Sequence, residues 1–332
     1  MTSQLISPDI ERRILTLCGA SSLVKATQIQ SLWSGYGMIW RCELEGYHAQ
    51  SVIVKHIHTA PKGQHPRGWA TDVAHQRKLR SYQVENHWYS HQGKSCDDAC
   101  RIPHLINYWQ EEDEWLMVLE DLDAVGYARR VQRPRPHEIE AVINWLAHFH
   151  ARFMNVDSDG LWPQGCYWHL DTRQEEWTQM THVELKAAAK IIDELLENAR
   201  YKTIVHGDAK LANFCFSDTG HEVAAVDFQY VGGGCGMKDL VYFLSSAMDA
   251  NSLKHHEEEF LAYYFDQLKM ALNEQGKDID YQLLKTEWQK LYAYAWADFH
   301  RFLDGWSPGH WKMHRYSKRL TTEVLNTIHE TQ

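Results

Sequence analysis

The chain has 332 residues, a length that suits one large two-lobed domain or two compact ones. Its 44% apolar and 23% charged residues are an ordinary globular mixture, and a formal net charge of −10 argues against nucleic acid as a partner. No apolar run reaches the roughly 18 residues of a transmembrane helix, so no membrane partner is expected. Charged residues replace the apolar core of a signal peptide near the N-terminus, which predicts a cytoplasmic protein.

Cysteine and histidine are scattered along the chain. The seven cysteines mostly have apolar neighbours, which favours reduced, buried thiols over a disulfide framework. Cys96 and Cys100 bracket two aspartates, but two ligands do not make a metal site. Among the 21 histidines we find no zinc-like spacing, and His148 and His150 are interpreted as ordinary residues of an apolar helix.

The first part of the chain alternates strand patterns with short helical ones. We expect helices at residues 7–18 and 75–89, and strands at 24–32, 38–44, 50–57, 101–110 and 115–120. A Glu-Gly-Tyr turn at residues 45–47 indicates a hairpin. These patterns predict an antiparallel sheet with one inserted helix.

After about residue 121 the pattern becomes mainly helical. Helices are expected at residues 137–153 and 181–200 and over most of the chain after 237, with short strands around a polar loop between 203 and 227. Strands first and helices afterwards indicate an α+β fold with two lobes, residues 1–120 and 121–332.

Chemistry concentrates in the segment His206-Gly-Asp-Ala-Lys-Leu-Ala-Asn213 and in Val226-Asp227-Phe228, each preceded by a strand-like run. Phosphoryl transfer needs one carboxylate to orient and deprotonate a hydroxyl. It also needs an amide oxygen and a second carboxylate to hold Mg²⁺ against the phosphates. The spacing follows the His-Arg-Asp-x₄-Asn and Asp-Phe-Gly pattern of kinases, with Gly207 for Arg and Gln229 for Gly.

This set resembles the aminoglycoside phosphotransferase and choline kinase superfamily. Asp239-Leu-Val-Tyr-Phe-Leu244 and Leu119-Glu-Asp-Leu122 are most similar to its ecdysteroid kinase-like branch, and the resemblance spans roughly residues 30–310. It implies a protein-kinase-like bilobal fold, with an antiparallel N-lobe sheet and a larger helical C-lobe. It also implies an ATP- and Mg²⁺-dependent kinase that phosphorylates a hydroxyl of a small molecule.

The resemblance assigns roles to residues of the second lobe. It implies that Asp208 is the catalytic base, that Asn213 and Asp227 bind Mg²⁺, and that Asp239 binds the backbone of the loop. Lys210 departs from the aminoglycoside phosphotransferases. It either neutralises charge on the transferred phosphoryl group or is a surface lysine.

In the first lobe, Lys55 ends the run Ser-Val-Ile-Val-Lys and matches the lysine that grips the nucleotide phosphates. Glu85, in the predicted helix, resembles the glutamate that orients this lysine. Weaker candidates for the lysine's role are Lys62, Arg77 and Lys78.

Two further nucleotide contacts are expected from position in the chain. Gly35 and Gly37 lie between two strands, where a phosphate-covering loop belongs, although they also suit a plain hairpin turn. Glu120 and Leu122 belong to the segment whose backbone would meet the adenine.

The acceptor is left open. Only residues 228–238 separate Asp227 from Asp239, and no Ala-Pro-Glu follows, which disfavours a peptide substrate. Aromatic residues crowd the C-terminal region and suit either core packing, a flat sterol-like alcohol or a choline-like cation. They are Trp288, Tyr292, Tyr294, Trp296, Phe299, Phe302, Trp306, Trp311 and Tyr316. Asp298, Arg301 and Asp304 are candidates to line the pocket, and an acidic pocket would suit an aminoglycoside. A sugar is a further possible acceptor.

Three rival interpretations remain. The chain is a pseudokinase that binds nucleotide without transferring phosphate, a protein kinase, or an aromatic-lined carrier of small ligands. The intact set of Lys55, Asp208, Asn213 and Asp227 argues against the first. Oligomeric state and the choice between ATP and GTP leave no signature in the sequence.

Overall fold

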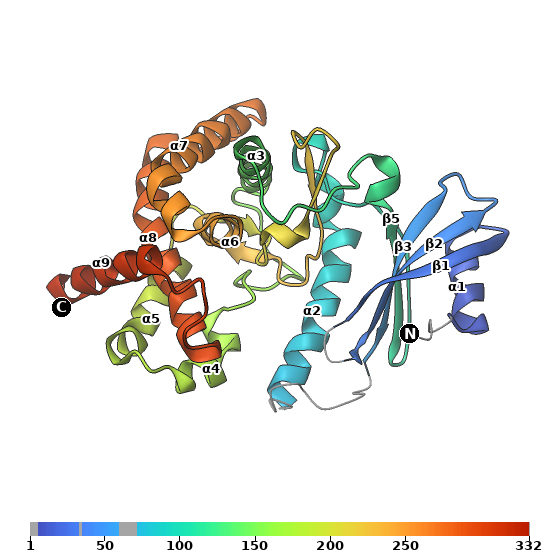
Figure 1. Ribbon diagram of the computed structural model, residues 1–332, viewed down its shortest axis with the longest axis horizontal. Coiled ribbons are helices and arrows are strands. Elements are labelled where there is room, and N and C mark those ends of the chain that lie inside the picture. Colours follow the sequence, from blue (N-terminus) through green and yellow to red (C-terminus); the bar gives the residue numbers. More distant parts are fainter. Residues whose placement is uncertain (1–5, 33–34, 60–71, 332) are drawn as a thin grey trace. The chain divides into compact units, whose positions relative to one another are not determined.

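Figure 1 shows the computed structural model, which describes residues 6–32, 35–59 and 72–331. The chain divides into two compact units. Unit 1 comprises Met1–Ser95 and Ile102–Arg129, and unit 2 comprises Cys96–Arg101 and Arg130–Gln332. None of the helices in the described ranges combines the length and the apolar character that crossing a bilayer requires.

Unit 1 contains a five-stranded antiparallel sheet in the order β1-β2-β3-β5-β4. Its strands are β1 (Ser22–Ser31), β2 (Gly37–Glu45), β3 (Ser51–His58), β4 (Leu105–Glu111) and β5 (Glu114–Glu120). The β2–β3 hairpin and the antiparallel sheet are as predicted. Strand β4 begins later than residue 101, because the carbonyl of Arg101 accepts hydrogen bonds from Trp145 Nε1 and from the amide of Ala225 in unit 2.

Each face of this sheet is covered by a helix, as the strand alternation requires (Figure 1). Helix α1 (Pro8–Cys18) has Ser7 as its N-cap and Gly19 in a left-handed conformation at its C-terminus, and it buries Ile10 and Ile14 against one face. Helix α2 (Asp72–Ser90) packs Tyr82 against the other face.

Unit 2 is mainly helical, and its helices lie in the predicted regions, apart from the short helix Gln174–Gln179, which was not predicted. They are α3 (Pro136–Arg152), α4 (Gln174–Gln179), α5 (Val183–Glu197), α6 (Met237–Ala247), α7 (Ala250–Glu274), α8 (Tyr281–Trp306) and α9 (Arg315–Thr331). Two short antiparallel pairs join β6 (Thr203–Val205) to β9 (Gly232–Gly234) and β7 (Phe214–Phe216) to β8 (Val223–Ala225). The α+β class with a strand-rich first part and a helical second part is confirmed.

Short 3₁₀ helices complete the described chain. They are η2 (Gln92–Ser95), η3 (Asp98–Cys100), η4 (Leu122–Val125), η5 (Leu170–Thr172) and η6 (Leu211–Asn213). The last of these ends at Asn213, one of the predicted site residues.

Helix α8 buries polar side chains that we expected to line an acceptor pocket. Asp298 is fully buried and accepts bonds from Arg301 Nε at 2.9 Å and from Trp168 Nε1 at 3.0 Å. Asp304 accepts from the amides of Thr181 at 2.7 Å and His182 at 2.9 Å, next to the start of α5. The pocket-lining interpretation is therefore wrong, because these charges tie α8 to its neighbours inside the core.

At Gly305 helix α8 lies too close to the backbone of α4 for a side chain, because a Cβ built there would lie 1.8 Å from the carbonyl oxygen of Glu176. Gly305→Ala should lower the free energy of unfolding by about 1–3 kcal/mol, since overpacking against backbone outweighs the roughly 1 kcal/mol gain in helix propensity. Urea unfolding measures this change.

Gly234→Ala is the matched control, since a Cβ there would meet only Val205 methyl groups at 3.3 and 3.6 Å. Equal losses in the two variants would contradict a clash specific to the contact between α4 and α8.

Candidate active site

The loop of residues 206–213 follows β6 and ends with η6, and it gathers three of the predicted residues. Asn213 donates through Nδ2 to the backbone oxygen of Asp208 at 2.8 Å and to its carboxylate Oδ2 at 3.0 Å. Lys210 Nζ lies 2.8 Å from the same Oδ2. Only 6% of Asp208 is exposed, so its carboxylate is held in one position by a cation and an amide.

The turn at Gly207 gives the loop its shape. Its φ is +77°, and a Cβ would lie 2.0 Å from the carbonyl oxygen of Tyr230, so only glycine fits. The buried Asp239 of α6 accepts from the amides of His206 at 2.6 Å and Gly207 at 2.9 Å. The expectation that Asp239 binds the backbone of this loop is confirmed.

The His206 side chain contacts both the backbone of the loop and that of Val226, which follows β8 and precedes Asp227. Its Nδ1 lies 3.2 Å from the amide of Asp208, and its Nε2 lies 3.0 Å from the carbonyl oxygen of Val226. Because an amide donates and a carbonyl accepts, these contacts assign the neutral tautomer with the proton on Nε2. The imidazole therefore couples the position of Asp208 to that of Asp227.

Asp227 follows β8 with a φ of 69°, in the left-handed region that few residues other than glycine adopt. The amide of Val226 donates to the carbonyl oxygen of Asn213 at 2.9 Å, and Gln229 Nε2 lies 2.5 Å from Asp227 Oδ1. Since Asn213 makes its side-chain hydrogen bonds through Nδ2, its Oδ1 remains available to a cation. An amide oxygen and a carboxylate form a donor set that fits Mg²⁺.

The charges in this loop perturb one another. Burial raises the pKa of Asp208; Lys210 opposes that rise, and the nearby charge of Asp227 adds to it. Burial acts to lower the pKa of Lys210, but the charges of Asp208 and Asp227 outweigh burial and raise it. The carboxylate thus holds a proton more tightly than an exposed aspartate does, which suits proton abstraction.

Lys312, in the connection between α8 and α9, was not identified from the sequence. Its ammonium lies 4.7 Å from the centroid of the Tyr242 ring and 5.4 Å from that of Phe299, and it contacts Ser245 Oγ at 3.3 Å. Burial lowers its pKa to about 8, a shift that the charge of Asp208 opposes and that of Lys210 reinforces. It is a second buried cation within electrostatic reach of Asp208.

Aromatic rings surround this ammonium and extend toward the 206–213 loop. Tyr167 lies with its ring centroid 5.4 Å from Tyr242 and 5.3 Å from Phe302, and Asp208 acts electrostatically on both tyrosines. We call Tyr167, Tyr242, Phe299, Phe302 and Lys312 the aromatic–lysine cluster. Most other rings of α8 are buried in the core. Trp311, in the connection after α8, is 61% exposed.

Unit 1 holds the predicted lysine and glutamate together. Lys55 Nζ lies 2.5 Å from Glu85 Oε2, and the two residues are 4% and 2% exposed. A buried pair of this kind persists only when both charges are matched. The rival Lys78 lies 4.6 Å from the Tyr82 ring centroid, and Lys62 is outside the described residues.

The remaining predicted nucleotide residues also lie in unit 1. Gly35 and Gly37 flank the turn from β1 to β2, with φ of 78° and 139°, while residues 33–34 are outside the described part. Glu120 ends β5 and accepts from the amide of His104 at 3.1 Å, and Leu122 begins η4. Their backbone roles stay predictions.

The depressed pKa of Lys312 has a consequence for stability. The folded state holds this proton less tightly than the unfolded chain, so folding stability rises with pH between about 8 and 10.5 and is flat below. The free energy of unfolding of wild type minus that of Lys312→Met should therefore rise by an amount on the order of 3 kcal/mol over this window.

Denaturant unfolding at several pH values measures this difference. Lys254→Met, at an exposed position of α7, controls for the loss of a positive charge as such. A pH-independent difference between wild type and Lys312→Met would contradict the buried position of the ammonium.

Comparison with known proteins gives a family match and a fold match. Residues 164–277, less than half of the chain, match the Ecdysteroid kinase-like family. No curated protein sequence matches. Choline kinase from Cryptosporidium parvum Iowa II has a TM-score of 0.53 at 10% identity, with coverage of 92% of this chain and 89% of that chain.

Two aminoglycoside phosphotransferases are also similar. The type VIII aminoglycoside-3'-phosphotransferase has a TM-score of 0.47 at 15% identity and covers 86% of this chain and 98% of its own. The enzyme from Streptomyces rimosus ATCC10970, in complex with ADP and streptomycin, has a TM-score of 0.48 at 14% identity, covering 86% and 99%. The predicted resemblance to the ecdysteroid kinase-like branch is confirmed for residues 164–277, and the chain has the fold of a choline kinase.

Proposed function

We propose that this chain is an ATP- and Mg²⁺-dependent phosphotransferase that moves the γ-phosphate to a hydroxyl group of a small molecule. The observation that carries the proposal is the Asp208 carboxylate, buried and held by Lys210 at 2.8 Å and Asn213 at 3.0 Å. Phosphoryl transfer relies on positioning and charge stabilisation more than on covalent chemistry, and this arrangement supplies both.

In this proposal Asp208 accepts the proton of the acceptor hydroxyl as the hydroxyl oxygen attacks the γ-phosphorus. The bond between the γ-phosphorus and the bridging oxygen to the β-phosphate breaks, and ADP leaves. Asn213 Oδ1 and Asp227 would hold Mg²⁺, which supplies positive charge against the phosphates. Lys210, which contacts Asp208, stabilises negative charge on the transferred group and keeps the carboxylate oriented.

Unit 1 would bind the nucleotide. Lys55, oriented by Glu85, would contact the α- and β-phosphates. The buried ion pair between Lys55 and Glu85 supports this role. Gly35 and Gly37 would cover the phosphates, and the backbone of Glu120 and Leu122 would meet the adenine. We accordingly assign nucleotide binding to residues 1–120 and the metal site and acceptor to residues 121–332, in a cytoplasmic protein.

The acceptor class follows from charge. Lys312 and Lys210 both lie within electrostatic reach of Asp208, and the charge of the same carboxylate acts on Tyr167 and Tyr242. A quaternary ammonium or a polycationic aminoglycoside needs an anionic partner, but in this cluster the positive Lys312 ammonium would repel it. The aromatic–lysine cluster therefore favours a neutral or anionic alcohol with an apolar body.

The rival functions are less well supported. A pseudokinase has no need for a buried, oriented Asp208 beside a metal-binding amide and carboxylate. Against a protein kinase, the short segment after Asp227 is folded back as β9, which pairs with β6 through Gly232, Gly233 and Gly234. A ligand carrier would require binding that ATP and Mg²⁺ do not influence.

Asp208→Asn should abolish acceptor-stimulated ATP consumption, by at least ~10²-fold in kcat, because it removes the base while keeping the size of the side chain. Turnover is measured with Mg²⁺ and a panel of alcohols that includes sterols, sugars, choline analogues and aminoglycosides. Asp218→Asn, at an exposed position next to β7, is the matched control and should retain activity.

If ATP does not bind the folded wild-type protein, the proposal is wrong. If ATP binds with Mg²⁺ but no alcohol of the panel stimulates turnover, the pseudokinase interpretation gains. Stimulation that survives in Asp208→Asn would remove the proposed role of that residue.

Lys312→Met tests the acceptor class separately. Methionine places an apolar side chain of similar length against the Tyr242 ring, so the substitution removes the positive charge with little change in size. We expect kcat/KM for a cationic acceptor to rise at least ~10-fold relative to that for a neutral one, since one unit charge at a few ångströms is worth more than 1.4 kcal/mol. An unchanged ratio would show that the ammonium does not select the acceptor.

A further inference from the structure

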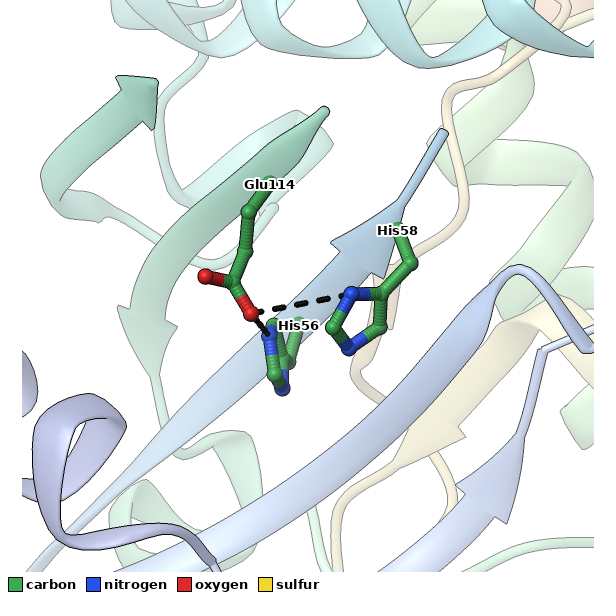
Figure 2. A group of neighbouring side chains, drawn as sticks. All are labelled: His56, His58 and Glu114. Carbon is green, nitrogen blue, oxygen red and sulfur yellow. Dashed lines mark hydrogen bonds and ion pairs between the residues drawn. The ribbon is translucent and has the colours of Figure 1, made fainter. Parts of the chain in front are cut away.

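Three potential metal ligands meet on the sheet of unit 1, on the face opposite to Lys55, and none of them has been assigned a role above. His56 Nε2 lies 2.8 Å from Glu114 Oε1, and His58 Nδ1 lies 3.6 Å from the same oxygen. Figure 2 shows both imidazoles turned toward this one carboxylate oxygen. Within the described ranges, no other group of three or more His, Cys, Asp or Glu side chains comes together this closely.

Strand geometry explains why these side chains converge. His56 and His58 are two apart on β3, so both point to the same face of the sheet, opposite to Lys55. Glu114 pairs directly with His58 in the antiparallel register of β3 and β5, and His56 lies diagonally from it. The imidazole ring centroids are 4.3 Å apart.

The backbone next to His58 and Glu114 is held in place by the adjoining residues Thr59 and Asp113. Thr59 donates its amide to the carbonyl oxygen of Asp113 and its hydroxyl to Asp113 Oδ1, both at 2.8 Å. The end of β3 and the β4–β5 turn are thereby joined at the residues next to His58 and Glu114. The ligand atoms are brought together by the backbone rather than by flexible side chains alone.

We propose that His56, His58 and Glu114 bind a divalent transition-metal ion of the Zn²⁺ class. Two imidazole nitrogens and one carboxylate oxygen form a common three-ligand zinc set that leaves a position for water. Metal–ligand bonds of about 2.0–2.1 Å place neighbouring ligand atoms of a tetrahedron roughly 3.3 Å apart. The separations of Glu114 Oε1 from His56 Nε2, 2.8 Å, and from His58 Nδ1, 3.6 Å, bracket this value, and one ligand atom of each residue lies within 4.8 Å of the other two.

The donor set also separates this ion from the nucleotide's Mg²⁺. Magnesium prefers all-oxygen, octahedral coordination, whereas imidazole suits zinc and its first-row neighbours. The side chains of His58 and Glu114 are 28% and 35% exposed, so an ion can reach them from solvent. His56 is only 10% exposed and forms the inner wall of the site.

The ion would act as a clamp between β3 and β5. Both strands are central in unit 1, and His56 directly follows Lys55 on β3. An ion that binds the folded state but not the unfolded chain increases the free energy of unfolding as the metal concentration rises. This inference does not depend on the proposed phosphotransferase activity, because its readouts are metal binding and thermal stability.

The test uses the full chain, stripped of metal with a chelator and titrated with Zn²⁺ or Co²⁺. We expect one high-affinity ion per chain, a rise in Tm with Zn²⁺, and the strong visible absorption of tetrahedral Co²⁺. Glu114→Gln and His58→Ala should each weaken binding at least ~10-fold and remove the Co²⁺ band, while circular dichroism confirms that both variants fold.

Two control variants represent the other metal-binding candidates. His91→Ala removes an imidazole that stacks on His87 with centroids 4.1 Å apart, and Cys96→Ser removes one thiol of the Cys96 and Cys100 pair. Both should bind the ion as wild type does. The proposal is overturned if the Co²⁺ band is absent from wild type, if it survives in Glu114→Gln and His58→Ala, or if it follows either control.

Discussion

The 206–213 loop depends on one buried carboxylate, that of Asp239. Asp239 lies in the first turn of α6 and accepts hydrogen bonds from the amides of His206 and Gly207. His150 Nε2 lies 3.2 Å from the same carboxylate. A buried carboxylate is tolerable only when such donors replace water. In return, it holds the left-handed turn at Gly207 that presents Asp208. The position of the proposed base therefore depends on a residue more than thirty positions later in the chain.

Charge is distributed in two different ways. The contacts between Lys55 and Glu85 and between Arg301 and Asp298 bury opposite charges against each other, which fixes side chains without creating reactivity. Around Asp208 more than two charges interact, although Lys210 lies 2.8 Å from its carboxylate. Its carboxylate is affected by a second carboxylate and by two ammonium groups, and burial raises its pKa. Several charges that interact strongly in one buried place are typical of functional sites, which is why we base the proposed function on this loop.

Strand β3 carries different chemistry on its two faces. Lys55 points to the side where Glu85 of α2 lies, and His56 and His58 point to the side where α1 packs further along the sheet. Under the two proposals, one strand would bind nucleotide phosphates through one face and a transition metal through the other. A clamp on the second face would act on the backbone that carries Lys55.

The sequence by itself determined most strands and helices of both units, though not α4 or β9, together with the antiparallel sheet and the grouping of Asp208, Lys210 and Asn213. It could do so because these features are local: alternation, helical periodicity, and a short loop whose residues are at most five positions apart. Only the tertiary structure decided which distant residues join them. Lys312 reaches the surroundings of Asp208 from the connection after α8, and Glu114 meets His56 and His58 through strand register. Asp298, Arg301 and Asp304 turned inward because neighbouring helices offered them buried partners. Contacts between residues far apart in the chain depend on packing, and no local pattern encodes them.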